Sequence, residues 1–413
     1  MDFQGTAPGL DDMLLDVVTV IELSDHDRKV AESRYAKLKP HLERPASALR
    51  ETIMNSASLI YPQGSMSIGA TVISGTDEDR YDVDVLVDMP VPPYWSDDEV
   101  LDRLYEALQG FPDVKKIVRC TRCVQMQFAF MHMDVTILDP APEPRLERVG
   151  EIFHSPDKGD AYRVPSNPYG FSQWYRQNVV YPSRESLNEM RTRRQQFGVN
   201  RLPETAVLAE ADQESLPPVV PDRVDAQQVY ALKLMKRFLN LRYEKGTLRR
   251  PPSIYLTKLS ATCGYTDRGL AAQFGLFAST IKTEMDKAYL ANLGPDERNP
   301  SYESDRLNDR WPETQADRKK LSDEMKYVLN NLDRARSSDI TDMLNIMADL
   351  FGERVKERAY ETFTNRFDQR GGRRNMSFER GTGTIIPATV ISAPTVVRSE
   401  VVRHNFHCED DED

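Results

Sequence analysis

The sequence predicts an α+β protein with two lobes, in which a small mixed sheet backed by helices precedes a mainly helical half. Strand-like runs with alternating apolar residues, such as "YDVDVLVDM" at 81–89, lie before about residue 165. Helical spacing dominates after that point, most clearly in "RVDAQQVYALKLMKRFLNLRYEK" at 223–245. The length of 413 residues is long for one core and suits two lobes.

The elements of the first half follow from local patterns. Residues 8–54 place apolar and charged positions at helical spacing, which predicts one long or two shorter helices. "SLIYPQGS" at 58–65 is typical of a strand that runs into a turn. Ser96 is the expected N-cap of an amphipathic helix over 96–108. Three further strands are expected in "VKKIVRCT" (114–121), "CVQMQFAFM" (123–131) and "HMDVTILDP" (132–140).

These patterns divide the chain into three regions. Residues 1–165 are expected to form an N-terminal helix and the sheet-containing core, and residues 166–368 a mainly helical lobe. Within that lobe, residues 180–225 are polar, Arg-rich and then Pro-rich, which predicts a loop excursion. Residues 369–413 combine glycines, prolines and charge blocks with little periodicity, so we expect a flexible or partner-dependent tail.

The charge balance limits the classes of partner. The chain has 54 Lys and Arg against 65 Asp and Glu, a formal net charge of -11. A general electrostatic footprint on bulk DNA or RNA is therefore not expected, although a local basic pocket for a small polyanion is compatible with it. Four cysteines are too few for a disulfide framework, and neither a signal peptide nor a membrane-spanning run is evident. We expect a cytoplasmic protein with no membrane partner.

Two aspartates on the strand at 81–89 raise the question of function. Asp82 and Asp84 point to the same face because strand side chains alternate, and Val83, Val85 and Val87 point to the other. Two neighbouring carboxylates repel each other unless a cation lies between them, and oxygen ligands favour Mg²⁺ or Mn²⁺. Asp134 lies on another apolar strand, expected to be a neighbour in the same sheet, and would complete the site.

The same two aspartates also suit the solvated edge of an amphipathic strand, and alone they do not decide between the two interpretations. The upstream stretch "GSMSIGAT" favours the metal site. Gly64 permits a tight turn, and Ser65 offers a hydroxyl and a backbone N–H at the start of a short helix, which is an anion site. A phosphate site followed by a metal-binding carboxylate pair is a specific combination.

"GS", then "DVDV", then a third aspartate on a later strand resembles the nucleotidyltransferase fold of DNA polymerase β and poly(A) polymerase. Within that group the chain resembles the bacterial cGAS/DncV-like nucleotidyltransferases, and the similarity covers roughly residues 55–360. Further stretches carry it: "SNPYGFSQWY" (166–175), "LKLMKRFLN" (232–240), "PPSIYLTKL" (251–259), "NPSYESDRLNDRW" (299–311) and "MADLFGERV" (347–355).

The resemblance implies roles for particular residues. Asp82, Asp84 and Asp134 would hold Mg²⁺ or Mn²⁺, with Asp134 also near the attacking hydroxyl. Gly64 and Ser65 would cradle a triphosphate, and Lys236 and Ser253 would bind its β and γ phosphates from the helical lobe.

Two assignments in the helical lobe stay open. Tyr255 suits stacking on a base or a place in the core equally well. Lys233 competes with Lys236 because it lies about one turn earlier on the same expected helix.

The resemblance also implies an activity. The enzyme would join nucleoside triphosphates (ATP, GTP or UTP) into a cyclic di- or trinucleotide and release pyrophosphate. The product would activate an effector in antiphage defence of the CBASS type, and the tail could be handled by a conjugating or regulatory partner. One alternative is an enzyme that makes linear products or transfers a nucleotide to RNA or protein. The other is an inactive nucleotide sensor. The three aspartates argue against the sensor, because such a module has no need of clustered carboxylates.

Overall fold

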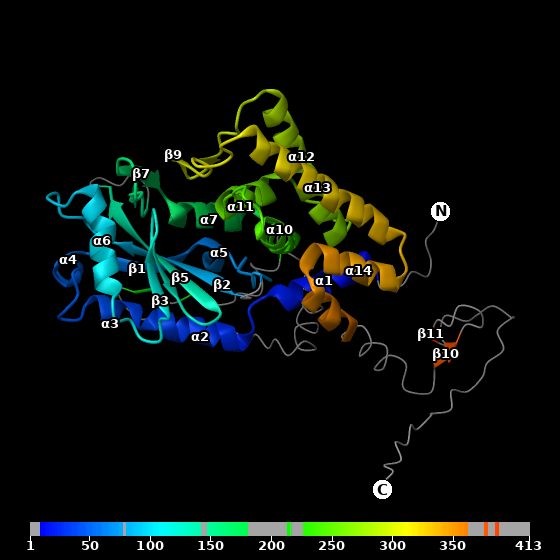
Figure 1. The fold of residues 1–413 in the computed structure, drawn as a ribbon, viewed down its shortest axis with the longest axis horizontal. Helices are drawn as coiled ribbons and strands as arrows, with labels where there is room; N and C mark the ends of the chain where they lie inside the picture. The colour runs from blue at the N-terminus through cyan, green and yellow to red at the C-terminus, as the bar shows by residue number, and fades with distance from the viewer. Residues whose placement is uncertain are drawn as a thin grey trace, which may run out of the picture.

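The computed structural model describes residues 9–76, 80–141, 147–180, 213–214, 216 and 226–361, and the backbone of 376–378 and 385–387. Two lobes lie side by side, one built around a sheet and one built of helices (Figure 1). The loop expected over 180–225 and the tail expected over 369–413 fall mostly outside the described residues. Within the tail, two short strands, β10 (Met376–Phe378) and β11 (Ile385–Pro387), form an antiparallel pair.

One mixed sheet organises the first lobe. Its strands are β1 (Leu59–Gln63), β2 (Tyr81–Asp88), β3 (Lys116–Arg119), β4 (Val124–Gln127), β5 (Met131–Pro140), β6 (Gly150–His154) and β7 (Tyr162–Ser166). The order is β1-β2-β5-β4-β3, and β6 and β7 continue from β5. The central pair β2 and β5 is parallel, whereas the other pairs are antiparallel. The predicted strands and the mixed character of the sheet are therefore confirmed.

Helices cover one face of this sheet. Val83, Val85 and Val87 are fully buried against them, so the alternation expected for β2 is confirmed. The segment 8–54 contains four helices rather than one or two, because Ser24 starts a new helix with a capping box and prolines interrupt the rest. The helices on this face are α2 (Asp25–Ala36), α3 (Leu38–Leu42), α4 (Arg50–Met54) and α6 (Asp97–Leu108).

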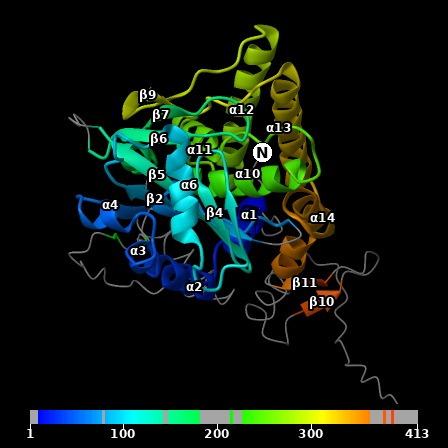
Figure 2. The same ribbon diagram turned by 60° about the vertical axis from the view of Figure 1, so that its left-hand side comes forward.

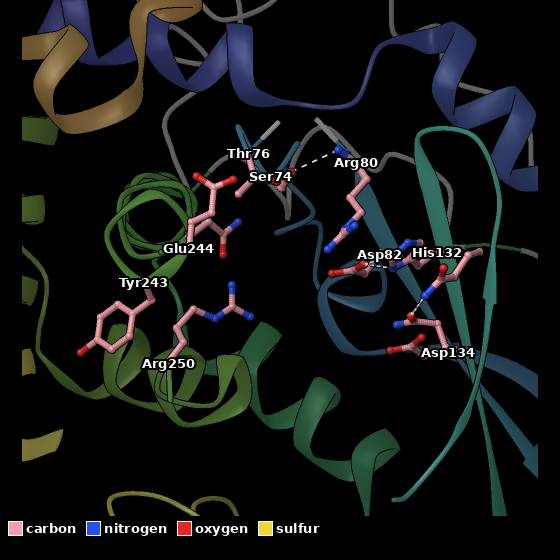
Figure 3. Close-up of a pocket in the computed structure, with 12 residues that line it drawn as sticks. Ser74, Thr76, Arg80, Asp82, His132, Asp134, Tyr243, Glu244 and Arg250 are labelled. Carbon is pink, nitrogen blue, oxygen red and sulfur yellow. Dashed lines mark hydrogen bonds and ion pairs between the residues drawn. The ribbon is translucent and has the colours of Figure 1, made fainter. Parts of the chain in front are cut away.

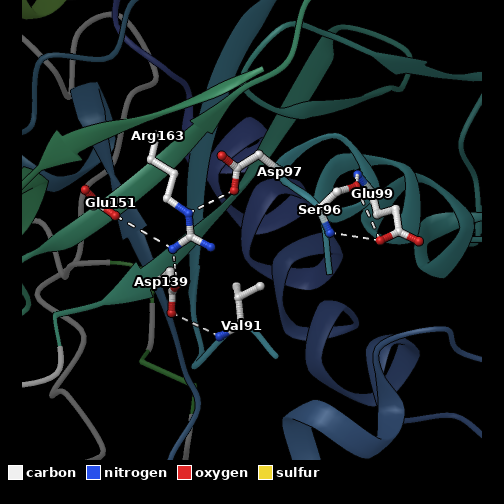
Figure 4. Close-up of polar contacts among 7 residues, drawn as sticks. All are labelled: Val91, Ser96, Asp97, Glu99, Asp139, Glu151 and Arg163. Atoms are coloured by element: carbon white, nitrogen blue, oxygen red, sulfur yellow. Dashed lines mark hydrogen bonds and ion pairs between the residues drawn. The ribbon is translucent and has the colours of Figure 1, made fainter. Parts of the chain in front are cut away.

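The start of α6 is fixed to the sheet by polar contacts (Figure 4). Ser96 is the N-cap, as predicted, and forms a reciprocal capping box with Glu99. The Arg163 guanidinium on β7 joins Asp97 at the first turn of α6 to Asp139 on β5, with N–O distances of 2.9 and 2.5 Å. This bridge connects the helix to two strands of the sheet.

The second lobe is a bundle around one central helix. Its helices are α7 (Pro168–Asn178), α10 (Gln227–Tyr243), α11 (Ser253–Thr262), α12 (Leu270–Leu290), α13 (Gln315–Arg336) and α14 (Ile340–Phe351), with a short antiparallel pair, β8 (Arg298–Asn299) and β9 (Tyr302–Arg306). Helix α10 is buried on nearly all sides, so it forms the core of the lobe. No helix in the described ranges combines the length and apolar character needed to cross a membrane.

The first helix, α1 (Leu10–Ile21), packs in the helical lobe, although the sequence analysis grouped it with the sheet-containing core. Met13, Leu14, Val17 and Val18 are buried in the same apolar cluster as α10, α12 and α14. In Figure 1, α1 lies beside α14, far along the chain. Figure 2 shows the same proximity after rotation of the view. The N-terminal helix therefore packs with the helical lobe rather than with the sheet-containing core in which it was expected.

Candidate active site

The parallel pairing of β2 with β5 brings the three predicted aspartates together. Asp84 lies directly beside Asp134 in the register, and Asp82 lies beside His132. The prediction that Asp134 occupies a neighbouring strand is confirmed. Because side chains two residues apart on a strand share a face, Asp82, Asp84 and Asp134 all project from the face opposite the helices α2, α3, α4 and α6. That face borders the cleft between the lobes.

Gly64 allows the backbone to approach the carboxylates closely. It begins the short helix α5 (Gly64–Ser67) at a φ of +61°, a conformation that favours glycine. A Cβ at this position would lie 2.1 Å from Oδ2 of Asp84. The next backbone N–H, that of Ser65, donates a hydrogen bond to the Asp84 carboxylate. The tight turn expected at Gly64 therefore brings the Gly-Ser step against the acidic residues.

Lys236 spans the cleft from the helical lobe. Its Nζ donates hydrogen bonds to Oγ of Ser65 and to the carbonyl oxygen of Ala70, the latter at 3.0 Å. The side chain is buried, and it forms no ion pair with a described carboxylate. Burial and the nearby Arg250 lower the pKa of Lys236 to about 8, although Asp84 opposes this shift. Lys236 thus lies where an anion bound at Ser65 would reach it.

Lys233, the competing lysine, faces another direction. It is buried between α10 and α1, where its Nζ lies 2.5 Å from Oε1 of the equally buried Glu22. This ion pair belongs to the core of the helical lobe. A substrate in the cleft therefore meets Lys236 rather than Lys233.

Tyr255 does not reach the cleft, which corrects the stacking role considered for it. The side chain is fully buried, its hydroxyl donates to Glu284 at 2.5 Å, and its ring packs against Trp311. Helical geometry gives the reason. Ser253 and Thr257, four residues apart on α11, both line the cavity, and a residue two positions after Ser253 points to the opposite side.

Burial, and after it the neighbouring like charge, raises the pKa values of Asp84 and Asp134. Burial, reinforced by the neighbouring Asp82, raises the pKa of Asp84 to about 6. Burial, followed by Asp84 and Asp82, raises the pKa of Asp134 to about 8. Gln125 opposes the second shift through a hydrogen bond to Asp134, and Gln127 fixes the Gln125 amide by donating to its oxygen at 2.8 Å.

The acidic residues fit a hard divalent cation. Oδ1 of Asp134 is buried and has no hydrogen-bond partner, so it is available as a ligand. In the described part of the chain, no three Asp, Glu, His or Cys side chains already converge in metal-binding geometry. The three carboxylates together with substrate phosphates would supply the oxygen ligands that Mg²⁺ prefers.

Two adjoining cavities of about 590 and 430 Å³ occupy the cleft and share several lining residues. The first is drawn in Figure 3, where the guanidinium of Arg80 lies next to Asp82 and Arg250 faces them from the helical lobe. The second contains Gly64, Ser65, Lys236 and Ser253. The structure therefore brings together all the predicted site residues except Tyr255.

Sequence reasoning did not single out four polar residues that line both cavities, namely Ser74, Arg80, Asn240 and Arg250. Asn240 could have been found, since it lies four residues after Lys236 and must share its helix face. Oδ1 of Asn240 is buried without a hydrogen-bond partner, as expected for a group that faces a ligand. Arg80 and Arg250 lie in connecting segments, where periodicity gives no direction.

Comparisons with known proteins agree with this site. No family model matches the chain. The chain is 31% identical over 398 residues to the cyclic dinucleotide synthase CdnG of Bradyrhizobium diazoefficiens, an alignment that covers 95% of this chain and 91% of that protein. The structure of that protein in complex with GTP matches with a TM-score of 0.72 and 29% identity, covering 86% of this chain and 98% of the other.

A more distant likeness concerns the fold alone. The Vibrio cholerae cyclic AMP-GMP synthase DncV, in complex with a linear intermediate, matches with a TM-score of 0.50 and 13% identity over 84% of this chain and 88% of the other. The two-lobed fold and its acidic cleft define a nucleotidyltransferase of the polymerase-β type. The chain belongs to the bacterial cGAS/DncV-like nucleotidyltransferases.

Proposed function

We propose that this protein is a cyclic dinucleotide synthase, which joins two nucleoside triphosphates into a ring and releases two molecules of pyrophosphate. The observation that carries the proposal is the register of β2 and β5, which sets Asp84 beside Asp134 and faces them toward Ser65 and Lys236. The relationship to a protein named as a cyclic dinucleotide synthase supports the same activity.

In each of two steps, a ribose hydroxyl of one nucleotide attacks the α-phosphorus of the other. The new phosphorus–oxygen bond forms as the bond to pyrophosphate breaks, and the hydroxyl proton passes to the Asp134 carboxylate and then to water. The Asp134 carboxylate suits this role because it lies beside Asp84 in the sheet and a hydrogen bond with Gln125 holds it in place. In the second step the nucleotide that was attacked first supplies the ribose hydroxyl, which attacks the α-phosphorus of the other nucleotide and closes the ring.

The other residues bind and orient the substrates. Ser65 and Lys236 would bind the triphosphate from opposite walls of the cleft, with Ser253 at the start of α11. Asp82, Asp84 and Asp134 would hold Mg²⁺ or Mn²⁺. Such a cation lowers the pKa of an attacking hydroxyl and neutralises charge on the leaving pyrophosphate. GTP is the first substrate to test, because the related structure contains it.

The decisive experiment incubates purified protein with Mg²⁺ and all four labelled nucleoside triphosphates, then with phosphatase, and identifies surviving products by mass spectrometry. A phosphatase-resistant dinucleotide supports the proposal, and its mass gives the bases. Products degraded to free phosphate would instead favour a linear synthase. If the wild type leaves the triphosphates unconsumed and the variant Asp82→Asn/Asp84→Asn gives the same result, a sensor would be favoured.

The cyclic product would serve as a second messenger for an effector in antiphage defence of the CBASS type, the role that the family resemblance implies. Cells that express the protein with its neighbouring genes should then resist phage infection. The same cells with the double aspartate variant should be as sensitive as cells without the system.

A further inference from the structure

Arg250 lies in the cleft on the connection between α10 and α11, and nothing in the reaction described above uses it. It lines both cavities, and its side chain is accessible to solvent. Figure 3 shows the guanidinium extending from the helical lobe toward Asp82. An accessible cation in this position faces the space that a substrate must occupy.

The neighbour Arg249 shows that Arg250 is held differently from a surface arginine. Arg249 pairs with Glu313 at 2.5 Å, and both side chains are more than half exposed, at 67% and 54%. Arg250 forms no ion pair with any described residue, and its nearest polar contact is Oγ of Ser253, at 3.5 Å. The guanidinium therefore faces the cavity with no described carboxylate in ion-pair contact, and Asp82 across the cavity is the acid that acts on its charge.

Arg250 also adds to the positive charge around Lys236. Its charge is, after burial, the main influence that lowers the pKa of Lys236, so the two cations lie close enough to repel each other. Lys233, by contrast, is neutralised by Glu22. Two cations in one cleft, beside the serine at the start of α11, form a site for a polyanion.

The positions of Lys236 and Arg250 in the cleft indicate which part of the substrate they would contact. Ser65 and Lys236 lie next to the carboxylates, where the α-phosphate reacts. Arg250 approaches from the helical lobe and donates to Oγ of Ser253 at 3.5 Å, and both residues line the cavity that also contains Ser65 and Lys236. Phosphates beyond the reacting one that reach Ser253 would therefore also reach Arg250.

We infer that Arg250 is a further substrate-binding residue, which holds the terminal phosphates of the donor nucleoside triphosphate together with Lys236 and Ser253. This inference rests on the proposed function. When the hydroxyl attacks, the bond between the α-phosphorus and the bridging oxygen breaks and its electron pair leaves on pyrophosphate. A planar guanidinium can donate two parallel hydrogen bonds to those phosphate oxygens, which lysine cannot do.

The test measures binding to the full-length protein by titration calorimetry with Mg²⁺, using inorganic pyrophosphate, GTP and GMP as probes. Arg250→Gln should weaken the binding of pyrophosphate and GTP roughly 10- to 100-fold and leave GMP nearly unchanged, because a charge-assisted contact to the terminal phosphates is lost. Arg249→Gln is the matched control, and its affinities should equal those of the wild type.

Arg250→Lys keeps the charge and should lose part of the affinity for pyrophosphate, which provides a second variant if Arg250→Gln folds poorly. Unchanged pyrophosphate binding by folded Arg250→Gln would overturn the inference while wild-type product formation still upheld the synthase. An equal loss of GTP and GMP would also overturn it, by pointing to a structural role. A wild-type protein that binds neither pyrophosphate nor GTP would overturn the inference and the proposed function together.

Discussion

The core of the helical lobe and the wall of the cleft hold buried charge in opposite ways. In the core, Lys233 is paired with Glu22 at 2.5 Å, and neither is exposed. At the cleft, Asp84 and Asp134 lie side by side with like charge, and Lys236 has no ion pair with a described carboxylate. Charges in the core are neutralised within the protein, whereas those in the cleft are arranged so that a ligand must neutralise them.

The largest effect is expected from removing the two aspartates of β2. Asp82→Asn/Asp84→Asn should lower the rate of pyrophosphate release by about 10³-fold or more, because several kcal/mol of charge stabilisation at the reacting phosphate is lost. The fold should persist, because amides fit the same space and repulsion is relieved. A coupled pyrophosphate assay and circular dichroism check both parts, and a folded but active variant would contradict the metal assignment.

Removing the paired charge in the core should affect stability rather than activity. Lys233→Met should lower the free energy of unfolding by about 3 to 5 kcal/mol, because Glu22 would remain buried without the Lys233 ammonium beside it. Activity per folded molecule should change little at low temperature. Denaturant unfolding measures the first effect and initial rates the second. Lys233→Met with Glu22→Gln should recover much of the stability, and a stable single variant would show that the pair is unimportant.

Lys236 offers the contrasting lysine on the same helix. Lys236→Ala should raise the KM for nucleoside triphosphate roughly 10-fold or more, since a contact between a charged group and phosphate is lost. Its stability should fall less than that of Lys233→Met, because no buried carboxylate is left unpaired. Steady-state kinetics over a range of triphosphate concentrations gives KM. A KM equal to that of the wild type would remove Lys236 from the phosphate site.

The smallest effect concerns pH. The folded protein holds protons on Asp84 and Asp134 more tightly than the unfolded chain does, because their pKa values are about 6 and 8 instead of near 4. Their contribution to stability is therefore complete below about pH 4 and is lost as pH rises through 6 and 8. Between pH 5 and 7, Lys236 stays largely charged in both states, since its pKa is about 8.

Without divalent cations, the free energy of unfolding of the wild type should consequently fall more steeply between pH 5 and 7 than that of Asp134→Asn. Added Mg²⁺ should raise the Tm more at pH 7 than at pH 5, because the cation competes with protons for the carboxylates. Parallel slopes for the two proteins would show that Asp134 is already ionised at pH 5.

Much of the catalytic half could be predicted from local patterns. The spacing of Asp82 and Asp84 fixes their common face on any strand, and Ser96 and Glu99 specify the start of α6 through a short-range capping box. Gly64 predicted a tight turn, but its contact with Asp84 could be found only from the tertiary structure. The choice between Lys233 and Lys236 could not be made, because α10 is buried on nearly every side and its periodicity is weak.

The sequence alone determined the strand and helix types, the shared face of Asp82 and Asp84, and the residue types of a phosphate and metal site, because all of these depend on neighbours within a few positions. The tertiary structure decided what depends on distant segments. It set Asp134 beside Asp84, directed Tyr255 into the core, placed α1 in the helical lobe, and brought Arg250 into the cleft. Strand register and packing between remote segments determine such positions, so a local sequence pattern does not predict them.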